Sequence, residues 1–381
     1  MALHRKYRWF YWPAWLAGLG AILALSNPWW VAAAVAVVGL VVGKVLFSGR
    51  ATDHARAAKP DAPAKAASHT APVVDERPPA PDERTIPGML QQGRHAFVIR
   101  NRDKWIDHPD GEELLAHAIS QLEATLGFVP ESDVLIRGTL TGTSEAHDHH
   151  VPIEPFLIGA HTVTNAMYQH FVDGGGYENL DLWPEDILPL VLEFCDRSGE
   201  LGPHYWTGGR FPTGQGNRPV VGICWYEAAA YARWIGQRLP NEAEWQMAAN
   251  WRVAGSSKSY QRAYPWGEAM DHERCNIWVS GRGEPVDVDE YPDGGAPNDV
   301  RQLIGNVWEW TDSDFEIRDQ KGEQILTDFP TKTIRGGAFD TFFESQASSE
   351  FRTGQNPLAR KHNIGFRCAL SADAIPMLVS A

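Results

Sequence analysis

Two groups of side chains in this sequence could bind a metal ion or react covalently. His147, Asp148, His149 and His150 are neighbours in the chain and are metal-ligand types. Such a cluster binds a metal only where its ligands converge in space, so a solvated loop is the simpler interpretation. The cysteines lie far apart, match no zinc-type spacing, and are Cys195, Cys224, Cys275 and Cys368. Walker and Rossmann glycine patterns are also missing from the sequence.

Short aromatic and glycine-rich signatures mark the C-terminal part of the chain. They are Gly305-Asn306-Val307-Trp308-Glu309-Trp310-Thr311, Arg335-Gly336-Gly337 and Gly365-Phe366-Arg367-Cys368. Glycine tolerates positive φ and close backbone approach, and tryptophan supplies a large buried area with one N–H donor. This composition favours an irregular, loop-rich core whose function resides on loops.

The signatures end a longer ordered series. Its earlier members are Thr164-Asn165, Arg238-Leu239-Pro240-Asn241-Glu242-Ala243-Glu244-Trp245, Tyr264-Pro265-Trp266-Gly267 and Asn276-Ile277-Trp278. Together the motifs closely resemble the formylglycine-generating enzyme, or sulfatase-modifying factor, family over residues 129–370. The resemblance implies an α+β, C-type-lectin-like fold with little regular secondary structure.

A narrower resemblance is to ergothioneine sulfoxide synthases. It rests on Gly174-Gly175-Gly176-Tyr177, Leu182-Trp183 and His204-Tyr205-Trp206. Those synthases take their iron-binding histidines largely from a separate helical domain. The segment before the body is too short here to hold such a domain.

The family resemblance also locates the catalytic residues, and this chain lacks them. The family's copper-binding cysteines and a neighbouring serine follow the Arg-Gly-Gly motif. Aligned on that motif, the serine falls on Ala338 and the cysteines fall on Thr341 and Gln346. Copper(I) prefers soft thiolate ligands, which threonine and glutamine do not supply. We therefore expect no copper and favour a non-catalytic protein; an oxidoreductase with a non-cysteine metal site is the alternative.

Family disulfides are affected in the same way. Cys368 matches a cysteine whose usual partner falls on Ala232, and a second pair falls on Ala249 and a position near Phe351. Neither pair can form, which fits a reducing compartment. A bond between Cys368 and Cys224 stays open.

Calcium is the remaining cofactor that the resemblance implies. The matching site consists of the Gly305 and Val307 carbonyls and the Glu309 carboxylate, with Gln302 in place of an asparagine. Hard oxygen ligands of this kind suit Ca²⁺, so these four residues are candidate ligands of a structural ion. A second family site, starting at Asn276, lacks an obvious acidic ligand.

The loop at residues 338–362 is the predicted binding surface, because it corresponds to the rim of the family's active site. It mixes acidic residues with two adjacent phenylalanines, as recognition surfaces do, although the phenylalanines could equally be core. Two arginines could contact an acidic partner or pair with local acids. The predicted binding residues are Asp340, Phe342, Phe343, Glu344, Gln346, Arg352 and Arg360.

A third hypothesis concerns the end of this loop. Ile364-Gly365-Phe366-Arg367 resembles the element that closes the variable stretch of lectin-like proteins diversified by retroelements. A neighbouring template repeat and reverse transcriptase gene would distinguish this hypothesis from an ordinary binding protein.

Two apolar runs, at residues 9–25 and 29–47, predict a membrane hairpin that turns at Ser26-Asn27-Pro28. The second run has 19 residues, which at about 1.5 Å each nearly cross a hydrocarbon core of about 30 Å. Both flanks are basic, through Arg5, Lys6, Arg8, Lys44, Arg50, Arg56 and Lys59. The positive-inside rule then places both flanks and the main body in the cytoplasm, at a bacterial inner membrane. If one segment alone spans, the body is periplasmic.

Composition divides the chain into five parts. Proline, alanine and mixed charge after the hairpin indicate a tether that cannot bury enough apolar surface to fold. The parts are a membrane hairpin (1–48), the tether (49–88), a short helical lead-in (89–129), the lectin-like domain (130–372) and a tail (373–381).

Local patterns predict several elements inside these parts. In the lead-in, apolar residues recur at helical spacing from Leu114 to Leu126. Asn241 and Glu244 form a capping-box-like start for another helix. The remaining expected elements are a strand at 153–158 and helices at 164–171 and 225–237.

The formal net charge of −14 argues against a nucleic-acid partner, which requires a basic face. The whole sequence therefore predicts a membrane-anchored, non-catalytic domain that binds a protein partner or ligand. Such a domain suits an accessory subunit of a larger membrane assembly.

Overall fold

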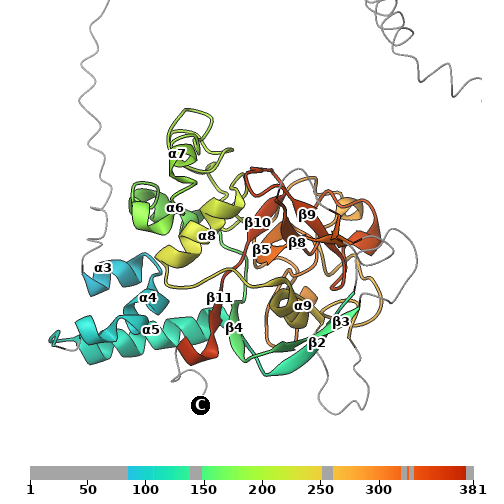
Figure 1. Cartoon of the computed structure of the whole chain (residues 1–381), viewed down its shortest axis with the longest axis horizontal. Coiled ribbons are helices and arrows are strands. Elements are labelled where there is room, and N and C mark those ends of the chain that lie inside the picture. The colour runs from blue at the N-terminus through green and yellow to red at the C-terminus, as the bar shows by residue number, and fades with distance from the viewer. Residues whose placement is uncertain are drawn as a thin grey trace, which may run out of the picture. The chain divides into compact units, whose positions relative to one another are not determined.

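The computed structural model describes residues 85–105, 107–137, 148–250, 261–318, 324–325 and 330–374 (Figure 1). The predicted membrane hairpin, most of the tether, His147 and the tail from residue 375 lie outside these ranges. Among the helices within them, none is both long and apolar enough to cross a bilayer. The hairpin stays a prediction of the sequence.

Short strands form the centre of the body, where Figure 1 shows them beside helices of similar length. One sheet has the order β10-β5-β8-β9 and another the order β1-β4-β11; β2 pairs with β3, and β6 with β7. The strands are β1 (Leu126–Val129), β2 (Ser132–Ile136), β3 (His149–Ile153), β4 (Phe156–Gly159), β5 (Trp308–Asp314), β6 (Ile317–Arg318), β7 (Gln324–Ile325), β8 (Lys332–Arg335), β9 (Arg352–Gln355), β10 (Ile364–Phe366) and β11 (Ala369–Ser371).

The four-stranded sheet brings the three C-terminal signatures together. β5 carries the tryptophan motif and pairs parallel with β10 and antiparallel with β8. In this register Glu309 lies opposite both Gly365 and Arg335. Motifs that are far apart in the sequence therefore occupy adjacent positions on neighbouring strands.

Most helices lie on one side of the strands (Figure 1), and side chains fix several of their first turns. The Thr164 hydroxyl accepts a hydrogen bond from the Met167 N–H and caps α6. Asn241 and Glu244 form the reciprocal bonds of a capping box at α9, with N···O distances of 2.8 and 2.9 Å. The α-helices are α3 (Ile86–Gln91), α4 (His95–Arg100), α5 (Gly111–Thr125), α6 (Asn165–Asp173), α7 (Leu188–Val191), α8 (Trp225–Trp234) and α9 (Glu242–Asn250).

Single turns of 3₁₀ helix connect these elements. They are Arg102–Lys104, Leu180–Leu182, Trp278–Ser280, Pro292–Gly294, Glu344–Gln346 and Ala372–Ala374. Of these turns, Glu344–Gln346 lies within the predicted binding loop and Trp278–Ser280 lies beside it.

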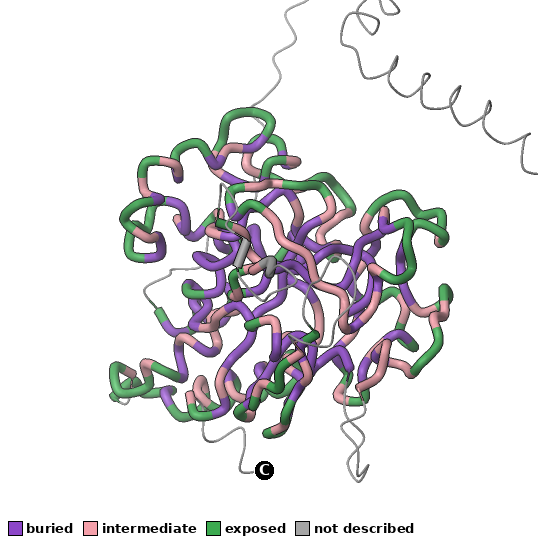
Figure 2. Tube along the Cα trace, turned by 45° about the vertical axis from the view of Figure 1, so that its right-hand side comes forward, coloured by how far each residue is buried: buried purple, intermediate pink, exposed green. Residues whose placement is uncertain are grey.

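The core is divided into three clusters of buried apolar side chains. Figure 2 shows buried segments running through the interior, with exposed loops around them. The largest cluster is rich in aromatic rings and joins α6 and α8 to β5 and β10. A second cluster lies between α9 and the strands β2–β4. In the third, α3–α5 pack on Leu157 of β4 and Leu370 of β11.

Several sequence predictions differ in detail from the structure. The strand expected at 153–158 is interrupted at Glu154 and Pro155, so β3 and β4 are separate strands in different sheets. Leu126 begins β1 instead of continuing α5. His149 and His150 were expected in a solvated loop but start β3, because their backbone pairs with β2. The expected helices at 164–171, at 225–237 and after Asn241 are confirmed, although α8 ends at Trp234.

Candidate functional site

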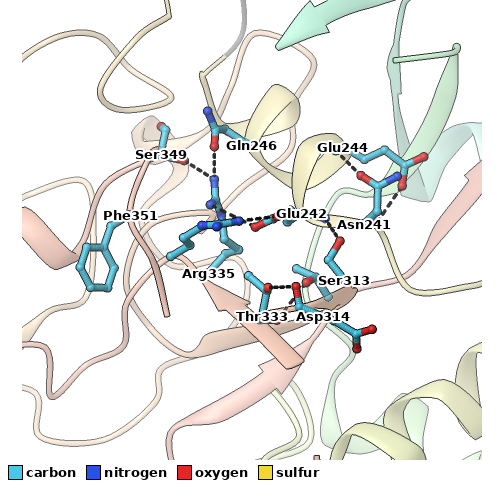
Figure 3. A network of polar contacts seen from close by, with 12 residues as sticks. Asn241, Glu242, Glu244, Gln246, Ser313, Asp314, Thr333, Arg335, Ser349 and Phe351 are labelled. Carbon is cyan, nitrogen blue, oxygen red and sulfur yellow. Dashed lines mark hydrogen bonds and ion pairs between the residues drawn. The ribbon is translucent and has the colours of Figure 1, made fainter. Parts of the chain in front are cut away.

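A buried arginine anchors the base of the predicted binding loop. Arg335, at the end of β8, is fully buried. Its guanidinium donates to the amide oxygen of Gln246 in α9 and to the Ser349 carbonyl, and the N···O distance to Ser349 is 2.8 Å. Its guanidinium also lies over the Trp245 ring, 5.3 Å from the centroid. Figure 3 shows these groups converging from the helix, the strand and the far end of the loop. The network therefore fixes to the core both ends of the segment between β8 and β9, which is the first part of the predicted binding loop.

The charge on Arg335 is retained despite burial. Burial lowers the pKa of this guanidinium to about 10, which still leaves it protonated at neutral pH. Glu242 lies 4.0 Å away and is also paired with Arg352 at 2.5 Å. A buried cation of this kind needs hydrogen-bond acceptors, and here the loop's own backbone provides one.

Glycine is required directly after Arg335. Gly336 has a φ of +94°, and a Cβ at this position would lie 2.6 Å from the Leu303 carbonyl oxygen. At the other end of the loop the Ser349 hydroxyl donates to the Ala249 carbonyl at 3.2 Å. These contacts explain locally why an Arg-Gly-Gly sequence begins this loop.

The residues on which the family resemblance places the catalytic side chains lie within the loop. Ala338 is fully buried, and its N–H donates to the Thr341 hydroxyl at 2.8 Å. Gln346 ends a 3₁₀ turn, and its N–H donates to the Phe343 carbonyl. An alkyl group, a hydroxyl engaged within the turn and an amide do not form a donor set for copper(I). The absence of copper stays a prediction, and these residues fit it.

Exposed apolar side chains cover one face of the loop. Phe342 and Phe343 are 66% and 62% exposed, and Trp278 and Val279 in the neighbouring turn are 59% and 57% exposed. Ring centroids are 6.2 Å apart for Trp278 and Phe342 and 5.3 Å apart for Phe342 and Phe343. We call these four residues the aromatic patch. Both phenylalanines are at the surface, so the alternative that they belong to the core is wrong.

Polar and acidic groups border the aromatic patch. Glu344 pairs with His272 at 2.7 Å, and both side chains are about half exposed. Asp340 accepts hydrogen bonds from the Asn363 amide at 3.0 and 3.1 Å and lies 3.5 Å from a His362 ring nitrogen. An apolar centre with a polar rim is the usual anatomy of a protein interface.

The structure does not bring the two predicted arginines to this surface. Arg352 is only 11% exposed and is paired with Glu242 beneath the loop. Arg360 pairs with the buried Glu227 at 2.9 Å and donates to the Cys195 and Gly202 carbonyls. Burial raises the pKa of Glu227, with the opposing effect of Arg360 next in size. Both arginines pair with local acids, as the alternative interpretation expected, and they do so mostly inside the protein.

Three of the four candidate calcium ligands are engaged by protein groups. Both Glu309 oxygens are bound: Arg367 donates at 2.7 and 2.8 Å, and the Trp245 indole N–H at 2.7 Å. The Gln302 amide oxygen accepts from Asn306 at 2.6 Å. The Gly305 carbonyl accepts from the Val307 N–H at 2.9 Å. As arranged, this set does not fit a Ca²⁺ ion, whose binding stays a prediction of the sequence.

The cysteines are separate from this surface. Cys224, Cys275 and Cys368 are buried and Cys195 is half-buried, and all four are unpaired, including the Cys224 and Cys368 pair that the sequence left open. Burial raises the pKa of Cys224 and Cys368, which favours unreactive thiols. In the part of the chain that the structure describes, no three His, Cys, Asp or Glu side chains are grouped so as to hold a metal ion.

The geometry of these motifs agrees with a comparison against known families. Residues 122–372 match the family described as sulfatase-modifying factor enzyme 1-like domain. The chain belongs to this family. The match begins inside α5, so the sulfatase-modifying factor domain here includes β1 and the end of the helical lead-in.

Three relatives illustrate how the family varies. The chain is similar to hercynine oxygenase of Mycobacterium tuberculosis, with 36% identity over 181 residues that cover 45% of this chain and 40% of the relative. It is similar to the formylglycine-generating enzyme of Streptomyces coelicolor, with 30% identity over a region that covers 59% of this chain and 81% of the relative. It is also similar to inactive C-alpha-formylglycine-generating enzyme 2 of Bos taurus, with 29% identity over a region that covers 59% of this chain and 80% of the relative. The chain spans about half the length of the hercynine oxygenases that it matches.

Two members of the aromatic patch were missed by sequence reasoning. Trp278 was assigned to a family motif and Val279 was not singled out, because neither lies near the binding loop in the sequence. The Trp278 N–H donates to the Thr341 carbonyl at 3.2 Å, which places this turn beside the loop. Only the fold reveals that adjacency.

Proposed function

We propose that this chain is a membrane-anchored, non-catalytic sulfatase-modifying factor domain that binds a protein partner. The aromatic patch is the observation that carries the proposal. Its four apolar side chains are each more than half exposed and lie together on the surface. Contiguous exposed apolar surface of this kind marks interaction sites in soluble domains.

A binding role is supported by what replaces the family's chemistry. Ala338, Thr341 and Gln346 stand at the positions of the catalytic serine and cysteines, and no thiol is available there. The relative from Bos taurus carries the word inactive in its name, so the family includes at least one member described in that way. The contacts of Arg335 with Gln246 and Ser349 hold the loop although these side chains are replaced.

The charges around the aromatic patch favour a protein over a lipid surface. Glu344 and Asp340 border the patch, and the chain carries a net charge of −14. An anionic bilayer would repel such a rim, whereas a partner with apolar anchors and basic neighbours would complement it. A tether to the membrane would keep the domain near a partner in the same assembly, as an accessory subunit.

A paired-variant purification tests this proposal. The full chain is isolated from gently solubilised membranes as the wild type and as Phe342→Ser/Phe343→Ser, and the co-purifying proteins are compared. The double variant removes two anchors without changing a buried contact, so the partner is expected to be lost while the chain remains folded. Melting temperature checks the fold.

A matched control uses other exposed apolar side chains. Leu180 and Leu192 are 62% and 75% exposed and lie outside the aromatic patch. The variant Leu180→Ser/Leu192→Ser is expected to keep the partner. A complex that survives the phenylalanine changes, or that is lost equally in both double variants, contradicts the proposal.

An oxidoreductase is the second candidate function. The observation that favours it is the 36% identity to a hercynine oxygenase, although this covers only 45% of the chain. Stoichiometric iron or copper in the purified protein, or O₂ consumption with a thiol substrate, distinguishes this candidate from the binding protein.

A further inference from the structure

A cavity lies between the helical lead-in and the rest of the body, away from the aromatic patch. Its wall includes residues of α3, α4 and α5 on one side and of β4, α6 and α8 on the other. Figure 1 shows α3–α5 grouped on one side of β4, with α6 and α8 beside them. The cavity measures about 480 Å³, which is within the usual range for a small-molecule site.

Hydrogen bonds fix the two walls relative to each other. The Phe97 N–H of α4 donates to the Ile235 carbonyl at 3.1 Å, directly after α8. Arg94 donates to the Trp234 carbonyl at 3.1 Å, and its guanidinium lies over the Trp234 ring. Because these contacts tie α4 to α8, the cavity is preformed and its shape does not depend on a mobile loop.

The cavity wall carries no formally charged residue, although the chain as a whole is strongly acidic. None of its lining residues is Asp, Glu, Lys or Arg, and its polar members are mostly histidines and glutamines. Burial, and then the nearby His117, lowers the pKa of His95 to about 4. Burial, and then Arg367, also lowers the pKa of His161. Both imidazoles are therefore neutral at physiological pH.

Two acceptors in this wall have no donor within the described residues. Gln92 is 4% exposed, and its amide oxygen has no hydrogen-bond partner there. The same holds for Nδ1 of His161. In the tautomer that carries its proton on the other ring nitrogen, Nδ1 is an acceptor. Buried acceptors are normally satisfied, so each indicates a donor supplied by a bound molecule.

We propose that this cavity binds a small uncharged molecule with an apolar ring body and at least one N–H or O–H donor. The apolar body would occupy the space lined by Leu90, Leu122 and Val163. The donor would bond to Gln92 or His161. A charged ligand is disfavoured because no group of opposite charge lines the wall and burial would cost it its hydration.

Binding of a metal ion between histidines is the competing interpretation. The rings of His95 and His117 are 6.4 Å apart between centroids. Two imidazoles alone are a weak site, and no third suitable ligand is grouped with them among the residues that the structure describes. The experiment therefore includes zinc as a separate arm.

Indole and its analogues provide a direct test. The full chain in lipid nanodiscs is titrated calorimetrically with indole, 1-methylindole and indole-3-carboxylate, with empty nanodiscs as blanks. Indole has one donor on a neutral ring, whereas 1-methylindole lacks the donor and the carboxylate is charged. Saturable binding of indole is expected, about fivefold weaker for 1-methylindole because one hydrogen bond is lost. At least tenfold weaker binding is expected for the carboxylate.

Two variants identify the acceptors. Gln92→Leu removes an unpartnered buried acceptor while keeping its approximate volume, so the fold is expected to be as stable as the wild type or more so. The fivefold preference for indole over 1-methylindole should fall in Gln92→Leu or in His161→Phe. Comparing the ratio of the indole and 1-methylindole affinities between wild type and variant isolates the hydrogen bond, because general effects on the cavity change both affinities alike. Gln355→Leu on β9, outside the cavity, should leave the preference unchanged.

The outcomes separate the interpretations. No saturable binding of indole, equal affinity for the three compounds, or an unchanged preference in both cavity variants would overturn the proposal. Saturable zinc binding that is lost in His95→Phe, without binding of indole, would also overturn it and favour the metal interpretation.

Discussion

A buried ion pair at Glu309 now stands where the sequence suggested a calcium ligand. Glu309 and Arg367 are each no more than 1% exposed and are joined by two short hydrogen bonds. Glu309→Gln should destabilise the protein by about 3–5 kcal/mol, because it leaves the guanidinium buried without its counter-charge. Urea unfolding followed by tryptophan fluorescence measures this change.

The surface pair between Lys332 and Asp314 is the control for that prediction. Its N···O distance is also short, at 2.9 Å, but Asp314 is 72% exposed. Asp314→Asn should therefore change the free energy of unfolding by about 1 kcal/mol or less. If Glu309→Gln costs no more than Asp314→Asn, the ion pair is not the structural centre that its burial indicates.

His95 should make stability depend on pH. Its pKa is lowered from 6.5 to about 4 by burial and by His117, so between those values the unfolded chain binds a proton that the folded chain does not. Stability then falls as the pH falls from 6.5 towards 4. His95→Gln removes this titration, so the wild type should lose more stability than the variant between pH 7 and pH 4.5. The prediction is contradicted if the free energy of unfolding changes by the same amount between pH 7 and pH 4.5 in the wild type and in His95→Gln.

At the residue scale, the sequence indicated where the binding loop lies but not which acidic residues pair with its arginines. The family motifs directed attention to the loop after Arg335, and both phenylalanines in it are on the surface. Arg352 and Arg360 looked equally available, but their partners Glu242 and Glu227 are more than one hundred positions away. A pairing across that separation is set by the fold, so composition and spacing could not predict it.

A single glycine allows the helical lead-in to pack closely against the end of α8. Gly236 has a φ of +81°, and a Cβ there would lie 2.4 Å from the backbone nitrogen of Phe97 in α4. Gly236→Ala should therefore separate α4 from α8 and raise amide hydrogen exchange throughout α3–α5. The most sensitive amide is that of Phe97, because its acceptor is the Ile235 carbonyl.

A second glycine separates backbone strain from the steric clash. Gly208 also has positive φ, at +64°, but a Cβ there would meet nothing within 4 Å. Gly208→Ala should cost only the left-handed strain of about 1–2 kcal/mol, with no effect on exchange in α4. If amide hydrogen exchange in α4 is the same in Gly236→Ala and in Gly208→Ala, the close approach of Gly236 to Phe97 does not hold α4 in place.

At the element scale, helices with side-chain caps were predictable and short strands were not. Thr164 and Asn241 cap their helices through local bonds that the sequence already encodes. The break between β3 and β4 and the start of β1 at Leu126 depend instead on strand partners elsewhere in the chain. β1 pairs with β4 more than twenty-five positions later, which the helical spacing of the preceding leucines did not reveal.

In the sequence, the predicted membrane hairpin and the tether precede the domain that carries the proposed binding surface. Deletion of residues 1–48 should release the chain from the membrane fraction, since the tether has too little apolar surface to hold it there. The basic residues on both sides of the hairpin further predict that the domain faces the cytoplasm. In intact bacterial spheroplasts an external protease should therefore leave the domain uncut, and it should cut the tether once the membrane is permeabilised. Digestion in intact spheroplasts would instead mean that a single segment spans and that the aromatic patch faces periplasmic partners.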